Sequence, residues 1–423
     1  MELSSILEIV GFALIALCLF DLATVNYSSP IKWLYRLTGS YKVQLVAQVL
    51  LFLAGIVLVL QSLVPAFSAF GSVGVWGKIG ALMRGLLLLI SVVIFMFLFK
   101  VAVNPAGLLL FFRNKNNADT VSDTVTPVRS QPWESDYFLD SDVSFDSRYP
   151  NNYFDIYSPG RSTGEKRPVF IYVHGGGYVA GSKSNGDPNA LGIAGIVRMI
   201  KKLVDVGFTV ISTNHALAPE YHYPTPVHQM TELLQFLKQH EDEFGIDMSR
   251  VVLGGGSAGG QIMAQLANIQ TNPQYAQEMQ IEPVLGNGEI KAMYHGCALL
   301  DNERFARTNS RIVNYIFHQM GRAYFNVGVP EGDPQVISSN VIRYATANYP
   351  PSFICDGNAG TFNAQAHDFA DRLKSLGVRH KALIFDAPDE GRVPHGFDTL
   401  EYPQGYQSME EMVAFVREEV FGA

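Results

Sequence analysis

The chain has 423 residues, of which 48% are hydrophobic and 17% are charged. That length allows one large domain with an attached segment, and the high apolar share indicates that the attachment is a membrane segment. The net charge of −8 is uneven, because residues 1–113 carry +4 and the remainder carries −12. An acidic globular part argues against nucleic acid as a partner, since nucleic-acid binding needs a basic surface. The three cysteines (Cys18, Cys297 and Cys355) are scattered, so they indicate neither a metal site nor a disulfide framework.

Residues 1–113 contain three apolar stretches, at 6–25, 43–67 and 81–103. Each approaches the roughly 20 residues that a helix needs to cross a bilayer, so we expect a multi-pass membrane region. A cleaved signal peptide fits the first stretch poorly, because Glu2 stands where basic residues are expected and no small-residue cleavage pattern follows. Lys and Arg gather in the first loop and after the third stretch. This bias predicts an external N-terminus and a cytoplasmic C-terminal domain, with the plasma membrane as the expected location.

Residues 114–132 are rich in Asn, Asp, Ser and Thr, which is typical of a solvated linker. From residue 133 to 423, β-rich apolar runs alternate with helical patterns. The expected strands are 153–157, 169–173, 209–213, 250–254, 292–300, 352–355 and 381–385, and the clearest helices are 196–206, 227–244, 258–268, 364–376 and 408–420. Such alternation predicts an α/β fold with a mostly parallel sheet covered on both faces. Ligands then bind beyond the carboxyl ends of the strands.

The segment LGGGSAGG, residues 253–260, follows an expected strand and opens an expected helix. Its glycines match the dinucleotide pattern G-x-G-x-x-G, but no acidic ribose partner follows about 20 residues on. The same segment matches G-x-S-x-G at Gly255–Gly259, the pattern of a nucleophile elbow centred on Ser257. Taken alone, an elbow and a plain tight turn are equally compatible with these residues.

Two further segments favour the elbow. Residues 172–178 read YVHGGGY, and His174–Gly177 would supply bare backbone N–H groups of the kind that build an oxyanion hole. His395 stands in a loop after the last expected strand. The order of oxyanion loop, serine and histidine is that of the α/β-hydrolases.

These segments together resemble the hormone-sensitive-lipase-like esterases of the α/β-hydrolase fold, also grouped as α/β-hydrolase-3 and similar to BD-FAE-like hydrolases. The resemblance covers about residues 150–420 and includes His174–Gly177, Leu217–Glu220, Gly255–Gly260 and His395–Phe397. It implies hydrolysis of carboxylic esters with Ser257 as nucleophile and His395 as base. The remaining residues that it implies are the N–H groups of Gly176, Gly177 and Ala258 as oxyanion hole, with His174, Gly175, Gly255 and Gly259 as motif residues.

The triad acid departs from the family pattern, because gapless matching puts Gly360 at its position. We rank Asp356, at the expected end of a strand, as the first candidate and Asp301 as the second. Asn358 is a neutral alternative that would orient His395 without charge. Residues 303–340 lie between two expected strands and form a possible cap, whose Phe305 and Phe317 would suit an apolar acyl or aryl group.

The sequence therefore predicts a membrane-anchored serine hydrolase that acts on lipid or small acyl esters. It implies no cofactor and no metal. The alternative is a catalytically silent binding or sensor module on the same fold, which the displaced acid alone supports. The pattern does not define an oligomeric state.

Overall fold

The computed structural model describes residues 3–23, 41–105, 128–133, 137–159, 165–183, 193–386 and 390–422. The chain divides into two compact units, Met1–Leu108 and Leu109–Ala423. Most of the expected linker, residues 114–127, lies outside the described residues. Its last part differs from expectation, because residues 128–132 belong to a strand that pairs with its neighbour.

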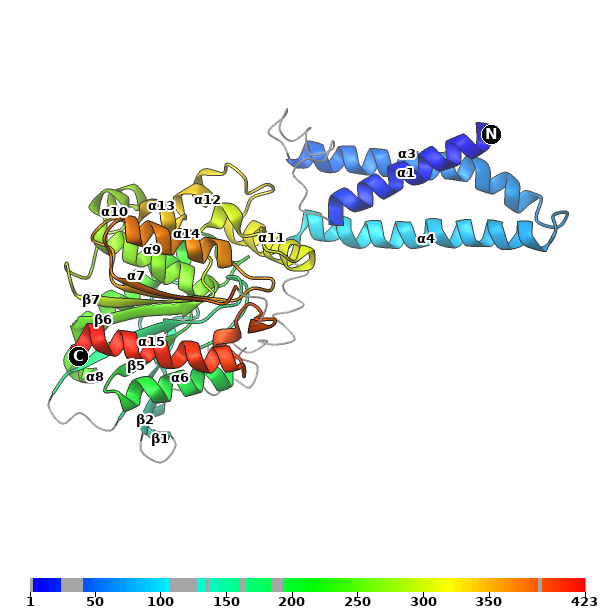
Figure 1. Cartoon of the computed structure of the whole chain (residues 1–423). Helices are drawn as coiled ribbons and strands as arrows, with labels where there is room; N and C mark the ends of the chain where they lie inside the picture. The colour runs from blue at the N-terminus through cyan, green and yellow to red at the C-terminus, as the bar shows by residue number, and fades with distance from the viewer. Residues whose placement is uncertain are drawn as a thin grey trace. The chain divides into compact units, whose positions relative to one another are not determined.

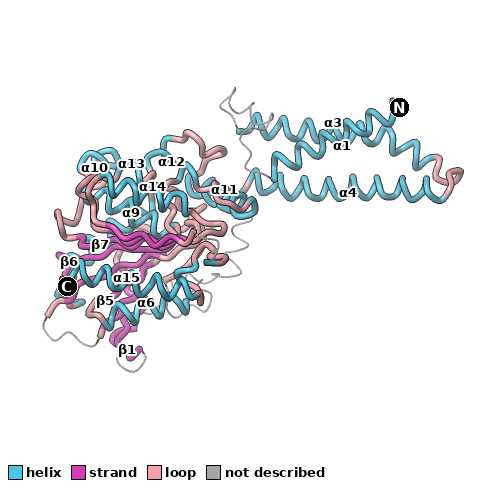
Figure 2. Tube along the Cα trace, in the orientation of Figure 1, coloured by secondary structure: helices cyan, strands magenta, loops and turns pink. Residues whose placement is uncertain are grey.

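The first unit consists of three helices, α1 (Leu3–Ala23), α3 (Tyr41–Ser68) and α4 (Val75–Val103). All three are long and apolar enough to cross a membrane. Figure 2 shows them running alongside one another. Helices α1 and α3 approach so closely at Gly11 and Gly55 that a Cβ on either glycine would lie 2.8 Å from the carbonyl oxygen of the other. Close backbone approach at small residues is how helices associate in lipid, where apolar burial gives little driving force.

Three charged side chains of these helices, Glu8, Asp21 and Arg84, have polar partners within the unit. Arg84 Nη1 lies 3.0 Å from Glu8 Oε2, and Gln48 donates to the buried carboxylate of Asp21. A charge in an apolar environment is costly unless it is paired, so these contacts explain how the helices carry Glu8, Asp21 and Arg84.

The second unit is built around one nine-stranded sheet in the order β1-β2-β3-β5-β4-β6-β7-β8-β9. The neighbouring pairs β1–β2, β2–β3 and β3–β5 are antiparallel. Every later pair in this order, from β5–β4 to β8–β9, is parallel. The strands are β1 (Val128–Trp133), β2 (Tyr137–Ser144), β3 (Tyr153–Ser158), β4 (Arg167–Val173), β5 (Thr209–Thr213), β6 (Ile246–Gly256), β7 (Ile290–Gly296), β8 (Ser352–Asp356) and β9 (His380–Ile384). Sequence reasoning missed β1 and β2, whose sequences VRSQPW and YFLDSDVS lack a continuous apolar run.

Helices cover both faces of this sheet. Figure 1 shows α9 and α14 on one side and α6 and α15 on the other. The helical elements are α6 (Ile193–Asp205), α7 (Thr225–Gln239), α8 (Glu241–Phe244), α9 (Ala258–Thr271), α10 (Pro273–Met279), η1 (Asn302–Arg304), α11 (Arg311–Phe325), α12 (Pro334–Ser338), α13 (Val341–Tyr344), α14 (Asn363–Ser375), η3 (Phe397–Thr399) and α15 (Pro403–Phe421). The mostly parallel sheet with two covered faces confirms the predicted fold class.

A large core lies between the sheet and the pair α6 and α15. Phe170, Tyr294 and Phe353 of the central strands pack there against Leu203 and Phe415 of the two helices. Strand β4 is buried along most of its length, which explains the continuous apolar run in its sequence. This core holds the carboxyl ends of β4, β6 and β8 at one edge of the sheet, where the site residues lie.

Candidate active site

Ser257 occupies the single residue between the end of β6 and the start of α9. Its φ of 51° and ψ of −115° are strained for a residue with a side chain, which is the backbone of a nucleophile elbow. The turn is compact because its glycines meet other backbone directly. A Cβ on Gly259 would lie 2.2 Å from Val173 O, and one on Gly255 would lie 2.5 Å from the carbonyl carbon of Gly259. The glycines are therefore required for the strand, the turn and the helix to fit together.

His395 reaches Ser257 from the loop between β9 and η3. Its Nε2 lies 2.9 Å from Ser257 Oγ, which is hydrogen-bonding distance. The rings of Phe317 and Phe362 approach the imidazole edge-on, with centroids at 5.3 and 5.2 Å. Burial lowers the pKa of His395 to about 4, so the imidazole is neutral at pH 7 and can accept a proton from the serine.

Asp356, the carboxylate ranked first from the sequence, is fully buried at the end of β8. Its Oδ1 accepts hydrogen bonds from the backbone N–H of Gly357, at 2.7 Å, and from the hydroxyl of Thr361. Thr361 Oγ1 in turn lies 3.2 Å from Nδ1 of His395. The carboxylate is thus separated from the imidazole by one hydroxyl, and burial raises the pKa of Asp356 to about 7.

Within the described residues, the side chains of the two other candidates for the orienting group form hydrogen bonds with partners other than His395. Asp301 caps η1 and binds Arg304 Nε at 2.5 Å and Asn340 Nδ2 at 2.8 Å, so its oxygens are committed elsewhere. The side chain of Asn358 is hydrogen-bonded to the loop that precedes His395. It donates to Gly391 O and accepts from the N–H of Val393, both at 2.9 Å.

The HGGG segment follows β4 and turns beside Ser257. Gly176 and Gly177 both have positive φ, at 114° and 61°, and a Cβ on Gly176 would overlap Ala180 O at 2.0 Å. Within the described residues, the N–H groups of Gly176, Gly177 and Ala258 donate to no acceptor. These residues line the same cavities as Ser257, and Ala258 is the first residue of α9, where free N–H groups favour a negative oxygen.

His174 begins this segment, and its ring nitrogen is hydrogen-bonded to the backbone of the segment itself. Its ring stacks on that of His215 with centroids 4.7 Å apart, and its Nδ1 donates to Gly175 O at 2.7 Å. Burial lowers the pKa of His174 to about 4, so the ring stays neutral.

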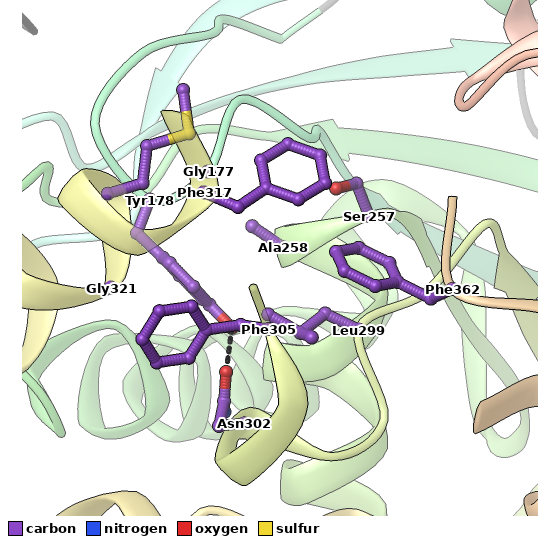
Figure 3. Close-up of a pocket in the computed structure, with 11 residues that line it drawn as sticks. Gly177, Tyr178, Ser257, Ala258, Leu299, Asn302, Phe305, Phe317, Gly321 and Phe362 are labelled. Carbon is purple, nitrogen blue, oxygen red and sulfur yellow. Dashed lines mark hydrogen bonds between the residues drawn. The ribbon is translucent and has the colours of Figure 1, made fainter. Parts of the chain in front are cut away.

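Two cavities meet at Ser257. One has a volume of about 330 Å³ and is lined by His395, the HGGG glycines, Asp398 and Leu400 among others. The second is small and apolar, and Figure 3 shows Ser257 and Ala258 at its rim with Phe305, Phe317 and Phe362 around it. Phe317 and Met320 of α11 line both cavities, so the expected cap segment contributes directly to the pocket wall.

Sequence reasoning missed Thr361, Met320 and Asp398. Thr361 directly follows Gly360, the residue that aligns with the family acid, so a hydroxyl next to that position was the available signal. Among the residues that the structure describes, no group of three or more His, Cys, Asp or Glu side chains could hold a metal ion.

Comparison with known proteins agrees with this geometry. Residues 170–397 match a family model described as alpha/beta hydrolase fold, and because the match covers more than half of the chain, the protein belongs to this family. Among curated relatives, Esterase LipC of Mycobacterium tuberculosis is 23% identical over 256 residues, which are 60% of this chain and 58% of that protein. Arylacetamide deacetylase of Oryctolagus cuniculus is 34% identical over 115 residues, which are 26% of this chain and 27% of that protein.

Among solved structures, Esterase B from Lactobacillus rhamnosis superposes with a TM-score of 0.57 at 17% identity. That superposition covers 76% of this chain and 96% of the esterase, and it establishes the shared fold. The chain spans less than two thirds of the length of the curated relatives it matches.

Proposed function

We propose that the protein is a serine hydrolase that cleaves carboxylic esters through an acyl-enzyme. The observation that carries this proposal is the 2.9 Å contact between Ser257 Oγ, on a strained elbow, and His395 Nε2. A neutral imidazole beside a serine hydroxyl is the arrangement that activates the hydroxyl as a nucleophile. The names of its relatives, which include an esterase and an arylacetamide deacetylase, support ester cleavage.

We assign each step of the reaction to a group of this site. Ser257 Oγ attacks the ester carbonyl while its proton passes to His395 Nε2. The N–H groups of Gly176, Gly177 and Ala258 stabilise the negative oxygen, and His395 then returns the proton to the departing alkoxide. Water, activated by the same imidazole, attacks the acyl-enzyme and releases the acid together with free Ser257.

The two cavities divide the substrate into an acyl part and an alcohol part. The small pocket walled by Phe305, Phe317 and Phe362 suits a short apolar acyl or aryl group. The larger cavity, of about 330 Å³, has room for the alcohol part. We therefore place the substrate among small acyl esters or lipid esters with an accessible acyl group.

Replacing Ser257 with Ala removes the nucleophile and should lower the hydrolysis of p-nitrophenyl butyrate by about 10³-fold or more. Ser249→Ala is the matched control, since Ser249 is exposed and contacts Asp247 far along β6 from the elbow. Initial rates of the purified full chain in detergent micelles measure the effect. Equal rates for the Ser257→Ala and Ser249→Ala variants would refute the assignment of the nucleophile.

The pH profile should follow the ionisation of Asp356. Only the carboxylate form stabilises the imidazolium that forms during the reaction, so protonation of Asp356 below its pKa of about 7 should lower kcat/KM. We expect kcat/KM to rise between about pH 5 and about pH 8 with its midpoint near this pKa. An Asp356→Asn variant should be about 10²-fold slower and should lose this inflection. If the variant keeps the inflection, another group controls the rate.

We further propose that α1, α3 and α4 anchor the hydrolase unit on the cytoplasmic side of the plasma membrane. Their length and apolarity support spanning, and the Lys and Arg bias of the flanking segments supports the orientation. The protein should remain in the membrane pellet after an alkaline carbonate wash. Protease added to intact cells should spare the hydrolase unit and should digest it after permeabilisation. Release by the wash, or digestion in intact cells, would contradict the anchoring or the orientation respectively.

A further inference from the structure

The hydroxyl of Thr361 lies between the imidazole of His395 and the carboxyl of Asp356. His395 Nδ1 lies 3.2 Å from Thr361 Oγ1, and the same hydroxyl donates to Asp356 Oδ1. Thr361 is 3% exposed and Asp356 is fully buried, so bulk water has little access to this chain of hydrogen bonds. Within the described residues, His395 Nδ1 has no side-chain partner other than Thr361.

The single proton of a hydroxyl gives this chain a direction. When Asp356 is ionised it can only accept, so the Thr361 proton points toward the carboxylate. The lone pairs of Thr361 then face His395 Nδ1, which must carry the ring proton in order to donate to them. That tautomer leaves Nε2 unprotonated, which is the form that accepts the proton of Ser257.

Protonation of Asp356 allows the reverse direction. A neutral carboxyl can donate to Thr361 Oγ1, and the threonine proton can then turn toward His395 Nδ1. The stable neutral ring in that arrangement carries its proton on Nε2 and can no longer act as a base toward Ser257. The hydroxyl therefore transmits the state of the carboxyl to the imidazole although the two do not touch.

The local backbone holds Thr361 in this place. Gly360 has a φ of 65° and donates its N–H to Asn309 Oδ1 at 2.7 Å. The loop carrying His395 is joined to the same segment, because the N–H of His395 donates to Ala359 O at 3.2 Å. The segments that carry Thr361 and His395 are thus held together by their backbone.

Three other ionisable groups interact with Asp356, namely Asp398, Cys297 and Cys355. Asp398 accepts from the hydroxyl of Tyr294 at 2.7 Å, and burial raises the pKa of its carboxyl. Burial likewise raises the pKa of the Cys297 and Cys355 thiols, so both remain neutral near pH 7.

We propose that Thr361 is a positioning residue that relays Asp356 to His395, so that the reactive group is a four-member chain of serine, histidine, threonine and aspartate. This inference rests on the proposed esterase function and adds to it the route by which the acid acts. Asp356 lies four residues before the position of the family acid. It can still act on His395, because the Thr361 hydroxyl contacts both side chains.

The test compares Thr361→Val, which removes the hydroxyl and keeps the shape, with Thr361→Ser, which keeps the hydroxyl. The full chain in detergent micelles is assayed with p-nitrophenyl butyrate across the pH range, and Tm verifies folding. Thr361→Val should lower kcat by about 10²-fold and abolish the inflection assigned to Asp356. Thr361→Ser should retain that inflection and most of the activity. Thr231→Val is the control, since the buried hydroxyl of Thr231 on α7 donates to Val227 O and, in the described part of the chain, has no other hydrogen-bond partner.

A double variant separates relay from structural damage. If Thr361 and Asp356 act through one chain, Asp356→Asn combined with Thr361→Val should lose no more activity than either change alone. Additive losses, or a Thr361→Val profile equal to that of the wild type, would overturn the relay while leaving the esterase intact. If Thr361→Val fails to fold, loss of the pH inflection in a folded Thr361→Ser variant overturns it instead. A wild-type chain that hydrolyses no ester overturns the proposed function and this inference together.

Discussion

The site depends on the close approach of two backbone segments, the end of β4 and the first turn of α9. The carbonyl oxygens of Val173 and His174 lie where a Cβ of Gly259 would stand, at 2.2 and 2.4 Å. Only glycine permits this contact, and the contact brings the HGGG segment beside Ser257. The strained φ of Ser257 is tolerated because the sheet on one side and the helix on the other over-determine the turn.

Burial then determines the electrostatics of the groups around that turn. Removing His395 from water lowers its pKa to about 4 and keeps it neutral, whereas the same effect raises the pKa of Asp356 to about 7. The imidazole is therefore ready to accept a proton, and the carboxyl changes its charge near neutral pH. The Thr361 hydroxyl contacts both side chains, and in the relay that we propose the activity of the base follows the charge of a group that it does not contact.

Much of this arrangement could be predicted from the sequence. The central strands have continuous apolar runs because both faces of the sheet are covered, and the elbow and HGGG glycines occur because backbone meets backbone there. Strands β1 and β2 were missed because their sequences, VRSQPW and YFLDSDVS, lack such a run. The link from Asp356 to His395 was also beyond sequence reasoning. A threonine hydroxyl can join two side chains only when folding places it between them. The ion pair of Asp301, the second-ranked candidate, with Arg304 likewise forms only in the folded chain.

The most direct test of the account is the chemical labelling of the elbow serine. The full chain in detergent micelles is incubated with a fluorophosphonate probe, digested, and analysed by peptide mass spectrometry. The account predicts one phosphonylated residue, Ser257, and loss of labelling when His395 is replaced by Ala, because the neutral imidazole activates that hydroxyl. Labelling at another serine, or none in the wild-type chain, would contradict the claim that the Ser257–His395 pair is the reactive centre.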